Sequence, residues 1–275
     1  MRKVFSISIL SLSLLCFMPS CDILKEELGL DIDNDKDKDQ EEEKPQINVN
    51  VKKTPCAYFS FDDNYNDLSG NDKYAYGNPE PTFAAGPKSG TKALSFSRAN
   101  GSKVVINDGL IDSPSMTVSL WVKDIDEGTI FWVTSSNNTN GYSDMMKLTF
   151  TNGHLRYVMD RYHCYYWSFD NLGHFTHKPI DDGEWHHIAL VCDHNILKEN
   201  HITTTLYVDG TQMDTVTEQY SSWSEKDANT CHFGTGTKFM IGGSNTPNMK
   251  IANLRVYDEW QMPADEVKKL YDKCM

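Results

Sequence analysis

The sequence predicts an all-β fold, a sandwich or jelly roll of antiparallel sheets that closes with one short helix. From residue 56 onward, short alternating apolar and polar runs are separated by Gly, Asn, Asp and Ser. This is the pattern of half-buried strands joined by turns. The 275 residues include 13 Tyr, 12 Phe and 6 Trp, an aromatic content that favours a folded core over a disordered chain. Only one segment has the spacing of an amphipathic helix.

The strands are expected in chain order, each bounded by turn residues. They are residues 56–61, 92–98, 103–106, 115–123, 129–134, 146–150, 154–159, 185–193, 202–208, 211–217, 238–242 and 250–257. Asp209-Gly210 separates two of these runs and is a hairpin signal. Many short strands at this spacing indicate a sandwich and not alternating strand–helix units.

The expected helix begins at Pro263, a residue that suits the first helical turn. Asp265 and Glu266 follow, where acidic side chains stabilise a helix N-terminus. The apolar residues of this segment recur at spacings of three and four: Val267, Leu270, Tyr271 and Cys274. We therefore expect one face of this helix to pack on the sandwich.

Residues 1–20 are expected to form a signal peptide. Arg2 and Lys3 precede an apolar stretch of 15 residues, which is short for a membrane span of ~20 residues. The stretch ends in Met18-Pro19-Ser20-Cys21, which resembles the lipobox of bacterial lipoproteins. The resemblance implies that Cys21 is lipidated and anchors the chain to a membrane. An ordinary cleaved signal with an incidental cysteine is the alternative.

Residues 21–52 are expected to form an extended acidic tether. Residues 22–50 hold 11 acids and 4 bases, and their mutual repulsion favours a solvated spacer. Lys25-Glu26-Glu27 resembles the export signal of Bacteroidetes surface lipoproteins, which implies an outer-membrane, surface-exposed location. The whole chain has a net charge of −13, which argues against a nucleic-acid partner.

Five blocks of the globular part follow one another in a distinctive order. They are Tyr58-Phe59-Ser60-Phe61-Asp62-Asp63, Thr117-Val118-Ser119-Leu120-Trp121-Val122-Lys123, Trp185-His186-His187, Leu206-Tyr207-Val208-Asp209-Gly210 and Leu254-Arg255-Val256-Tyr257. In this order they resemble laminin-G-like domains. The resemblance covers residues 56–273 and implies a concanavalin A-like jelly roll of two antiparallel sheets with a C-terminal helix. We expect this domain to span 53–275.

The expected function is non-catalytic binding of an extracellular polysaccharide or a glycoprotein glycan. Hydrolases of this superfamily carry two carboxylates as Glu-x-Asp-x-x-Glu on one strand, and glycoside hydrolysis needs such a pair. The globular part lacks this motif, and its nearest match, Asp124-Ile125-Asp126-Glu127, has the wrong spacing and runs into Gly128. A protein-binding adhesion or assembly module is the alternative, and a glycoside hydrolase is less favoured. The oligomeric state is left open.

Two places are candidates for ligand binding. Trp121 and Tyr207 share the polar face of strands 115–123 and 202–208, where they could form an aromatic platform; structural packing of Trp121 is the alternative. The second candidate is the aromatic loop around residue 165, where four side chains could form a sugar-stacking wall: Arg161, Tyr162, Tyr166 and Trp167. A small hydrophobic cluster is the alternative there.

The resemblance also implies a structural calcium ion, with Asp62 and Asp67 at the matching positions. Where relatives often carry an acidic pair, this chain has Ala252-Asn253. The ends of such jelly rolls lie together, so Cys56–Cys274 is the preferred disulfide, while Cys164, Cys192 and Cys231 are left open. No other cofactor is expected.

Overall fold

The structure is a computed structural model that describes residues 53–106, 109–113, 115–134, 144–159, 175, 179–195, 201–219, 238–243 and 245–274. The chain divides into two units, Met1–Gln46 and Ile47–Met275, and every described residue lies in the second. The expected signal peptide, Cys21 and the expected tether therefore lie outside the described residues. In the described part, no helix is long and apolar enough to span a membrane.

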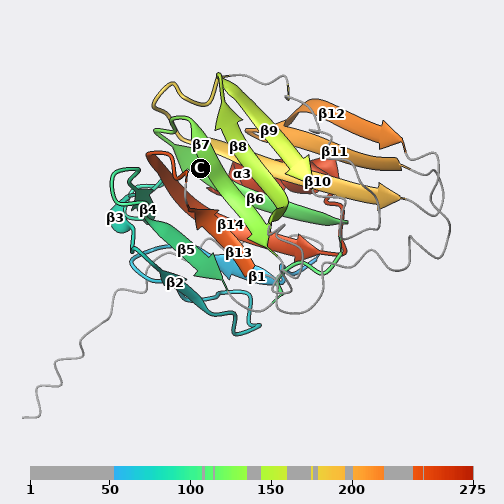
Figure 1. Ribbon diagram of the computed structural model, residues 1–275. Helices are drawn as coiled ribbons and strands as arrows, with labels where there is room; N and C mark the ends of the chain where they lie inside the picture. The colour runs from blue at the N-terminus through green and yellow to red at the C-terminus, as the bar shows by residue number, and fades with distance from the viewer. Residues whose placement is uncertain are drawn as a thin grey trace, which may run out of the picture. The chain divides into compact units, whose positions relative to one another are not determined.

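The second unit contains two antiparallel sheets (Figure 1). Sheet A has eight strands. Seven follow one another in the order β12 (Thr211–Gln219), β11 (His201–Val208), β10 (His186–Asn195), β6 (Met116–Lys123), β14 (Met249–Asp258), β4 (Lys92–Phe96) and β3 (Thr82–Ala85). The eighth strand, β1 (Ala57–Phe59), also pairs with β14. Sheet B has six strands, in the order β2 (Ala75–Gly77), β5 (Lys103–Ile106), β13 (Lys238–Gly242), β7 (Gly128–Thr134), β8 (Asp144–Thr151) and β9 (His154–Met159). The predicted fold class is confirmed.

Each strand expected from the sequence is present within a few residues of its predicted bounds. The first is shorter than predicted, because Phe61 has a φ of 60° and turns the chain out of the sheet. β2 and β3 were not expected. Both are short strands at the edges of their sheets, and they are too short to show an alternating pattern.

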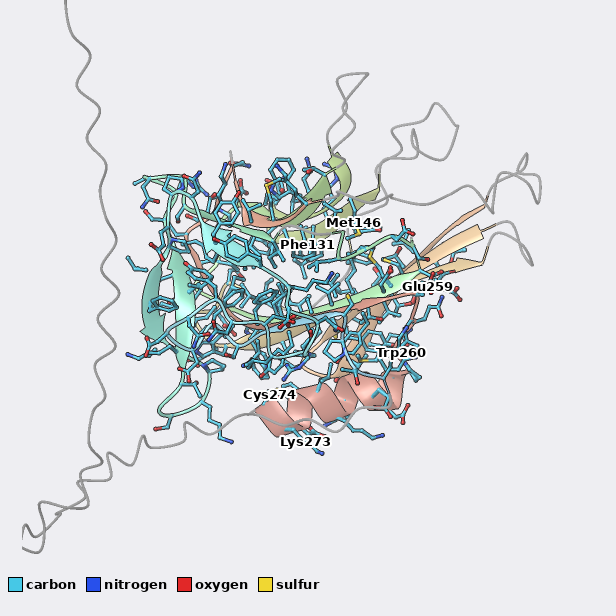
Figure 2. All side chains as sticks on the ribbon, turned by 90° about the horizontal axis from the view of Figure 1, so that it is seen from below. Phe131, Met146, Glu259, Trp260, Lys273 and Cys274 are labelled. Atoms are coloured by element: carbon cyan, nitrogen blue, oxygen red, sulfur yellow. The ribbon has the colours of Figure 1, made fainter. Side chains whose placement is uncertain are left out.

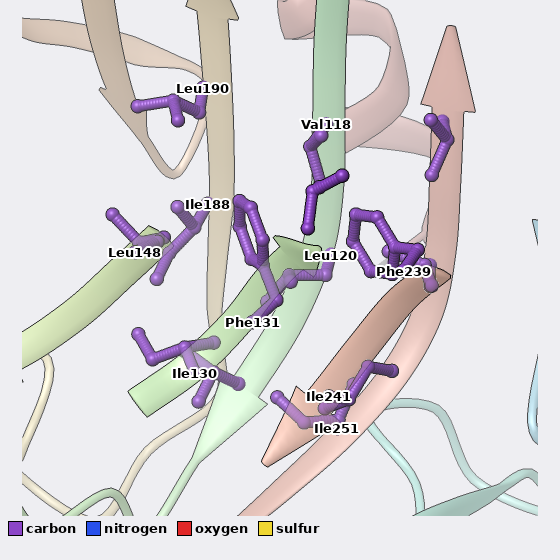
Figure 3. Packing of buried hydrophobic residues seen from close by; sticks show 14 of the residues in the cluster. Val118, Leu120, Ile130, Phe131, Leu148, Ile188, Leu190, Phe239, Ile241 and Ile251 are labelled. Atoms are coloured by element: carbon purple, nitrogen blue, oxygen red, sulfur yellow. The ribbon is translucent and has the colours of Figure 1, made fainter. Parts of the chain in front are cut away.

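The main core lies between the two sheets. In β6, Val118, Leu120 and Val122 point into it, as every second residue of a strand does. Figure 3 shows Val118 and Leu120 near Phe131 and Phe239 of sheet B. The rings of these two phenylalanines are stacked, with centroids 5.2 Å apart. Burial of these apolar side chains is the main force that holds the sheets together.

A helix forms a third layer on the other face of sheet A (Figure 2). α3 (Ala264–Cys274) begins after Pro263, whose carbonyl accepts hydrogen bonds from the backbone N–H groups of Glu266 and Val267. Val267 and Leu270 pack on Tyr257 and Tyr207 of the sheet. The predicted helix is therefore present, and the order of layers is sheet B, sheet A, α3.

Candidate functional site

Helix α3 closes the outer face of sheet A. Trp121 has no exposed surface, and its ring stacks on Tyr271 of α3 with centroids 5.8 Å apart and an interplanar angle of 15°. Tyr207 is 6% exposed and packs in the cluster that contains Leu270. The prediction that Trp121 and Tyr207 form an open ligand platform is therefore wrong, because the helix occupies the face on which a sugar would stack.

A buried polar layer lies beneath α3. Ser119 Oγ and His187 Nε2 are 2.8 Å apart, and both residues are 1% exposed. Burial, assisted by the charge of Arg255, lowers the pKa of His187 to about 3. The histidine of this pair is neutral at pH 7, and both side chains are buried under α3.

The outer face of sheet B carries a row of side chains that crosses five strands, which we call the outer row. In register across β2, β5, β13, β7 and β8, it consists of Tyr76, Val105, Met240, Trp132 and Lys147. Their sequence neighbours in these strands, such as Ala75, Phe131 and Phe239, lie in the core between the sheets. The side chains of the outer row therefore point away from the core.

Trp132 is the partly exposed aromatic residue near the middle of the outer row. A Cβ at Gly243 would lie 3.1 Å from its Nε1, and Gly243 has a φ of 134°, so the indole lies against the bare backbone of this glycine. Three strand spacings of ~4.8 Å separate the backbones of Trp132 and Tyr76, a span of about 14 Å. Val105 and Met240, 5% and 8% exposed, lie between the two aromatic residues.

A pair of stacked tyrosines lies at the end of the outer row, at the edge of the sheet. The rings of Tyr74 and Tyr76 are stacked with centroids 5.7 Å apart, and Tyr74 is 62% exposed. An exposed aromatic face at one end and a partly exposed indole near the middle, separated by the buried Val105 and Met240, provide two aromatic surfaces on which an extended ligand could stack.

The carboxylates nearest to a hydrolase motif are engaged in turns. Asp126 accepts hydrogen bonds from Arg98 and from both the backbone and the side-chain N–H groups of Asn248. Glu127 Oε1 accepts one from the backbone N–H of Asn152. These acids connect the segment before β7 to neighbouring loops. This segment is not a hairpin turn, because it joins β6 of sheet A to β7 of sheet B.

Asp62 and Asp67 do not present a shared metal site. The two carboxylate oxygens of Asp67 accept four hydrogen bonds from Tyr58, Ser69 and Lys73, and Asp62 Oδ1 accepts one from the backbone N–H of Lys92. Among the described side chains, no three His, Cys, Asp or Glu residues come close enough to hold one ion. These residues do not fit a bound calcium ion as they stand, and calcium stays a prediction.

The preferred disulfide is not formed. Cys56 and Cys274 are both free. Cys56 packs against the core between the sheets, whereas Cys274 lies beneath α3 with Trp121. The prediction was wrong because the two sulfur atoms lie on opposite faces of sheet A, although both residues lie near the ends of the domain.

The aromatic loop with Arg161, Tyr162, Tyr166 and Trp167 lies outside the described residues, as do Cys164 and Cys231. Trp132, Tyr74 and Tyr76 are not among the residues that the sequence predicts to bind a ligand. The alternation in β7 already places Trp132 on the face of the strand away from the core residues Phe131 and Val133. This alternation was the sequence signal that could have identified Trp132 as a candidate. Tyr76 gave no such signal, because β2 was not expected.

Several solved structures have a similar fold. Domain 4 of AbnA, a GH43 extracellular arabinanase from Geobacillus stearothermophilus solved with arabinotriose, has a TM-score of 0.55 and 20% identity, covering 81% of this chain and 98% of that one. The binding domain of Paraclostridial Mosquitocidal Protein 1 has a TM-score of 0.52 and 18% identity, covering 79% and 52%. A structure of botulinum neurotoxin type C, whose cell entry depends on interaction with two ganglioside molecules, has a TM-score of 0.52 and 11% identity, covering 80% of this chain and 50% of that one.

The chain thus spans about half of each toxin structure and nearly all of the arabinanase domain. At these identities the similarity shows a shared fold. No curated protein matches the sequence. The family model Laminin_G_3, described as the concanavalin A-like lectin/glucanases superfamily, matches residues 98–268, and the chain therefore belongs to this family.

Proposed function

We propose that this chain is a non-catalytic binding module that holds an extracellular carbohydrate on the outer face of sheet B. The observation that carries the proposal is the outer row, with Trp132 and Tyr76 separated by Val105 and Met240. Aromatic faces stack on the C–H groups of sugar rings, and the polar groups around them bind hydroxyls. With α3 over sheet A, sheet B offers the open face of the sandwich among the described residues.

The comparisons support the class of ligand. The arabinanase domain was solved with arabinotriose, and the type C neurotoxin structure concerns ganglioside molecules. Arabinotriose and gangliosides are ligands of the neighbouring proteins. Because those proteins share the fold of this chain, they support the proposal that its ligand is also a carbohydrate. The proposal of a non-catalytic role is supported by Asp126 and Glu127, which stabilise a turn.

The membrane context of the proposal comes from the N-terminal sequence. Lipidation at Cys21 would anchor the chain in the outer membrane, and the acidic tether would hold the sandwich away from the lipid surface at the cell exterior. In this arrangement the domain retains polysaccharide at the cell. Its partners are the glycan and, through the lipid anchor, the membrane.

The test is native affinity electrophoresis of the full chain, carrying Cys21→Ser to prevent lipidation, through gels that contain plant, fungal or host polysaccharides. Each gel is run with calcium and with a chelator, which also tests the predicted calcium dependence. We expect at least one polysaccharide to retard the protein. Replacing Trp132 with Ala should raise the Kd by about tenfold or more, since buried aromatic anchors dominate binding free energies.

The matched control is Trp260→Ala. Trp260 is also a partly buried tryptophan, but it packs on Tyr257 at the α3 side, with ring centroids 5.1 Å apart. It should leave retardation unchanged. Equal loss in both variants would remove the assignment to sheet B. Absence of retardation across the panel would contradict carbohydrate binding and favour a protein partner.

Lipid anchoring is tested separately. The wild-type chain should fractionate with outer membranes and be cleaved by protease added to intact cells. Cys21→Ser should release it from the membrane fraction. A Cys21→Ser protein that stays with membranes would contradict the proposed anchor.

A further inference from the structure

We propose that sheet B recognises its ligand at two separate points, Trp132 and Tyr76, and that the ligand is an extended chain of about four or more sugar residues that reaches both. This inference rests on the proposed function and defines the length and form of its ligand. Its starting point is the spacing of the aromatic surfaces in the outer row. Trp132 and Tyr76 are partly exposed, whereas Val105 and Met240 between them are buried.

The register of four strands sets the distance between the two points. The strands β2, β5, β13 and β7 pair in this order, and their register places Tyr76 and Trp132 in one straight row. Three strand spacings of ~4.8 Å give a backbone separation of about 14 Å. A sugar ring in an extended chain advances by roughly one strand spacing, so rings stacked on both residues are about three positions apart in the chain. A monosaccharide or disaccharide therefore reaches only one of the two points.

Both aromatic side chains are held in place by neighbouring groups. The indole of Trp132 lies against Gly243, where a Cβ would be 3.1–3.3 Å from three of its ring atoms. The ring of Tyr76 stacks on the ring of Tyr74 with an interplanar angle of 29°. Side chains that are ordered before binding lose little conformational entropy when a ligand stacks on them. The free protein thus already presents two stacking surfaces at a fixed separation.

Polar side chains flank the stretch between the two aromatic residues. Lys103 pairs with Gly242 on one side of the outer row, and Lys238 pairs with Thr134 on the other side. Each lysine lies two positions along its strand from a residue of the outer row, so both share its outward face. Ammonium groups donate hydrogen bonds to hydroxyl oxygens. A sugar chain that follows the row across the strands therefore has a donor beside each of its edges.

Two linked contacts make the affinity depend on chain length in a single step. Once one ring of a long chain is stacked, the second contact forms within the complex, at a high effective concentration. A chain that is too short makes only one contact. The Kd should therefore change little from one to three residues and fall by about tenfold or more at four or five. Such a site selects long chains over free monosaccharides and disaccharides.

The experiment measures the Kd against chain length by isothermal titration calorimetry, with the full chain carrying Cys21→Ser. Oligomers of about one to six residues, bracketing the predicted span, are prepared from each polysaccharide of the gel panel, among them arabinan, xylan, mannan and laminarin. In the series whose polymer retards the protein, we expect one drop in Kd of about tenfold or more between three and five residues. A Kd that is already at its final value for the disaccharide would overturn the two-point site. So would a polymer that binds while its longest oligomer does not.

Variants of Tyr76 and Trp132 test the two points separately. Tyr76→Ala and Trp132→Ala should each raise the Kd for the longest oligomer by about tenfold and abolish the drop with length, because one contact remains. The Kd for the disaccharide should stay within about twofold of wild type in Tyr76→Ala, since Trp132 is intact. Tyr76→Phe keeps the ring and is the matched control. Tyr76 lies on the outer side of an edge strand, so both of its variants are expected to fold, and thermal unfolding checks this.

The outcomes separate this inference from the proposed function. Retardation by none of the polysaccharides would overturn both. Binding without any drop in Kd along the series would overturn the two-point site and leave carbohydrate binding intact. A wild-type length dependence in Tyr76→Ala would show that the ligand does not use Tyr76, and would overturn the two-point site as well.

Discussion

At the scale of single residues, Asp67 stabilises the first loop of the domain. It accepts hydrogen bonds from three backbone N–H groups and one hydroxyl, of Tyr58, Ser69 and Lys73. Burial by itself would raise the pKa of Asp67, but these hydrogen bonds outweigh burial and lower the pKa below its usual value. The stabilisation is therefore complete at neutral pH and is lost as the pH falls through the pKa of the folded state.

Asp67→Asn is expected to lower the free energy of unfolding at pH 7 by about 1–3 kcal/mol, because an amide has one acceptor oxygen in place of two. The difference from wild type should shrink as the pH falls below the ordinary value of 3.8. Urea unfolding at several pH values measures both effects. Asp72→Asn, an exposed neighbour with a φ of 53° that Asn also adopts, is the control and should be neutral. A constant difference at all pH values would contradict this role.

His187 makes the opposite kind of contribution, because burial keeps it neutral. Its pKa falls from 6.5 to about 3 on folding, so between these values the unfolded chain binds a proton that the folded chain does not. The contribution of His187 to the free energy of unfolding is complete above pH 6.5 and declines as the pH falls toward 3. His187→Gln should therefore flatten the dependence of unfolding free energy on pH in this window. Parallel curves for both proteins would show that His187 is not the group responsible.

At the scale of elements, α3 determines which face of the sandwich remains open. The periodicity at Val267 and Leu270 predicted the helix, but nothing local to residues 263–274 states which sheet it covers. The strands were predictable because alternation is local. The outer row was not, because it depends on the register of β5 against β13 and of β13 against β7, which are far apart in the sequence.

Trp121→Ala tests the α3 layer directly. It should leave a cavity between sheet A and α3 and lower the free energy of unfolding by about 3–5 kcal/mol. The Kd of the folded variant for the proposed glycan should match that of wild type. Urea unfolding and affinity electrophoresis measure the two quantities. A variant of normal stability that no longer binds would place the ligand on sheet A and contradict the assignment to sheet B.

At the scale of the whole molecule, both sheets and α3 are built from residues after Lys53, whose ammonium group donates to the carbonyl of Asp258. The boundary expected at residue 53 is therefore testable by truncation. Residues 53–275 alone should unfold at the same midpoint temperature as a chain that also carries residues 21–52, because no described layer uses an earlier residue. Thermal unfolding followed by near-ultraviolet circular dichroism measures this, and a clearly lower midpoint for the short chain would move the boundary toward the N-terminus.

The place of β1 has a mechanical consequence. This strand is three residues long, and it pairs with the C-terminal half of β14, at Leu254, Arg255 and Val256. The backbone N–H of Cys56 adds one hydrogen bond to the carbonyl of Val256. A pulling force that enters at Lys53, as on a chain held at one end while its ligand is dragged by flow, acts on these few bonds first. β1 should therefore detach under load before any other strand, and the pairs of β14 with β4 and β6 would still hold the sandwich together.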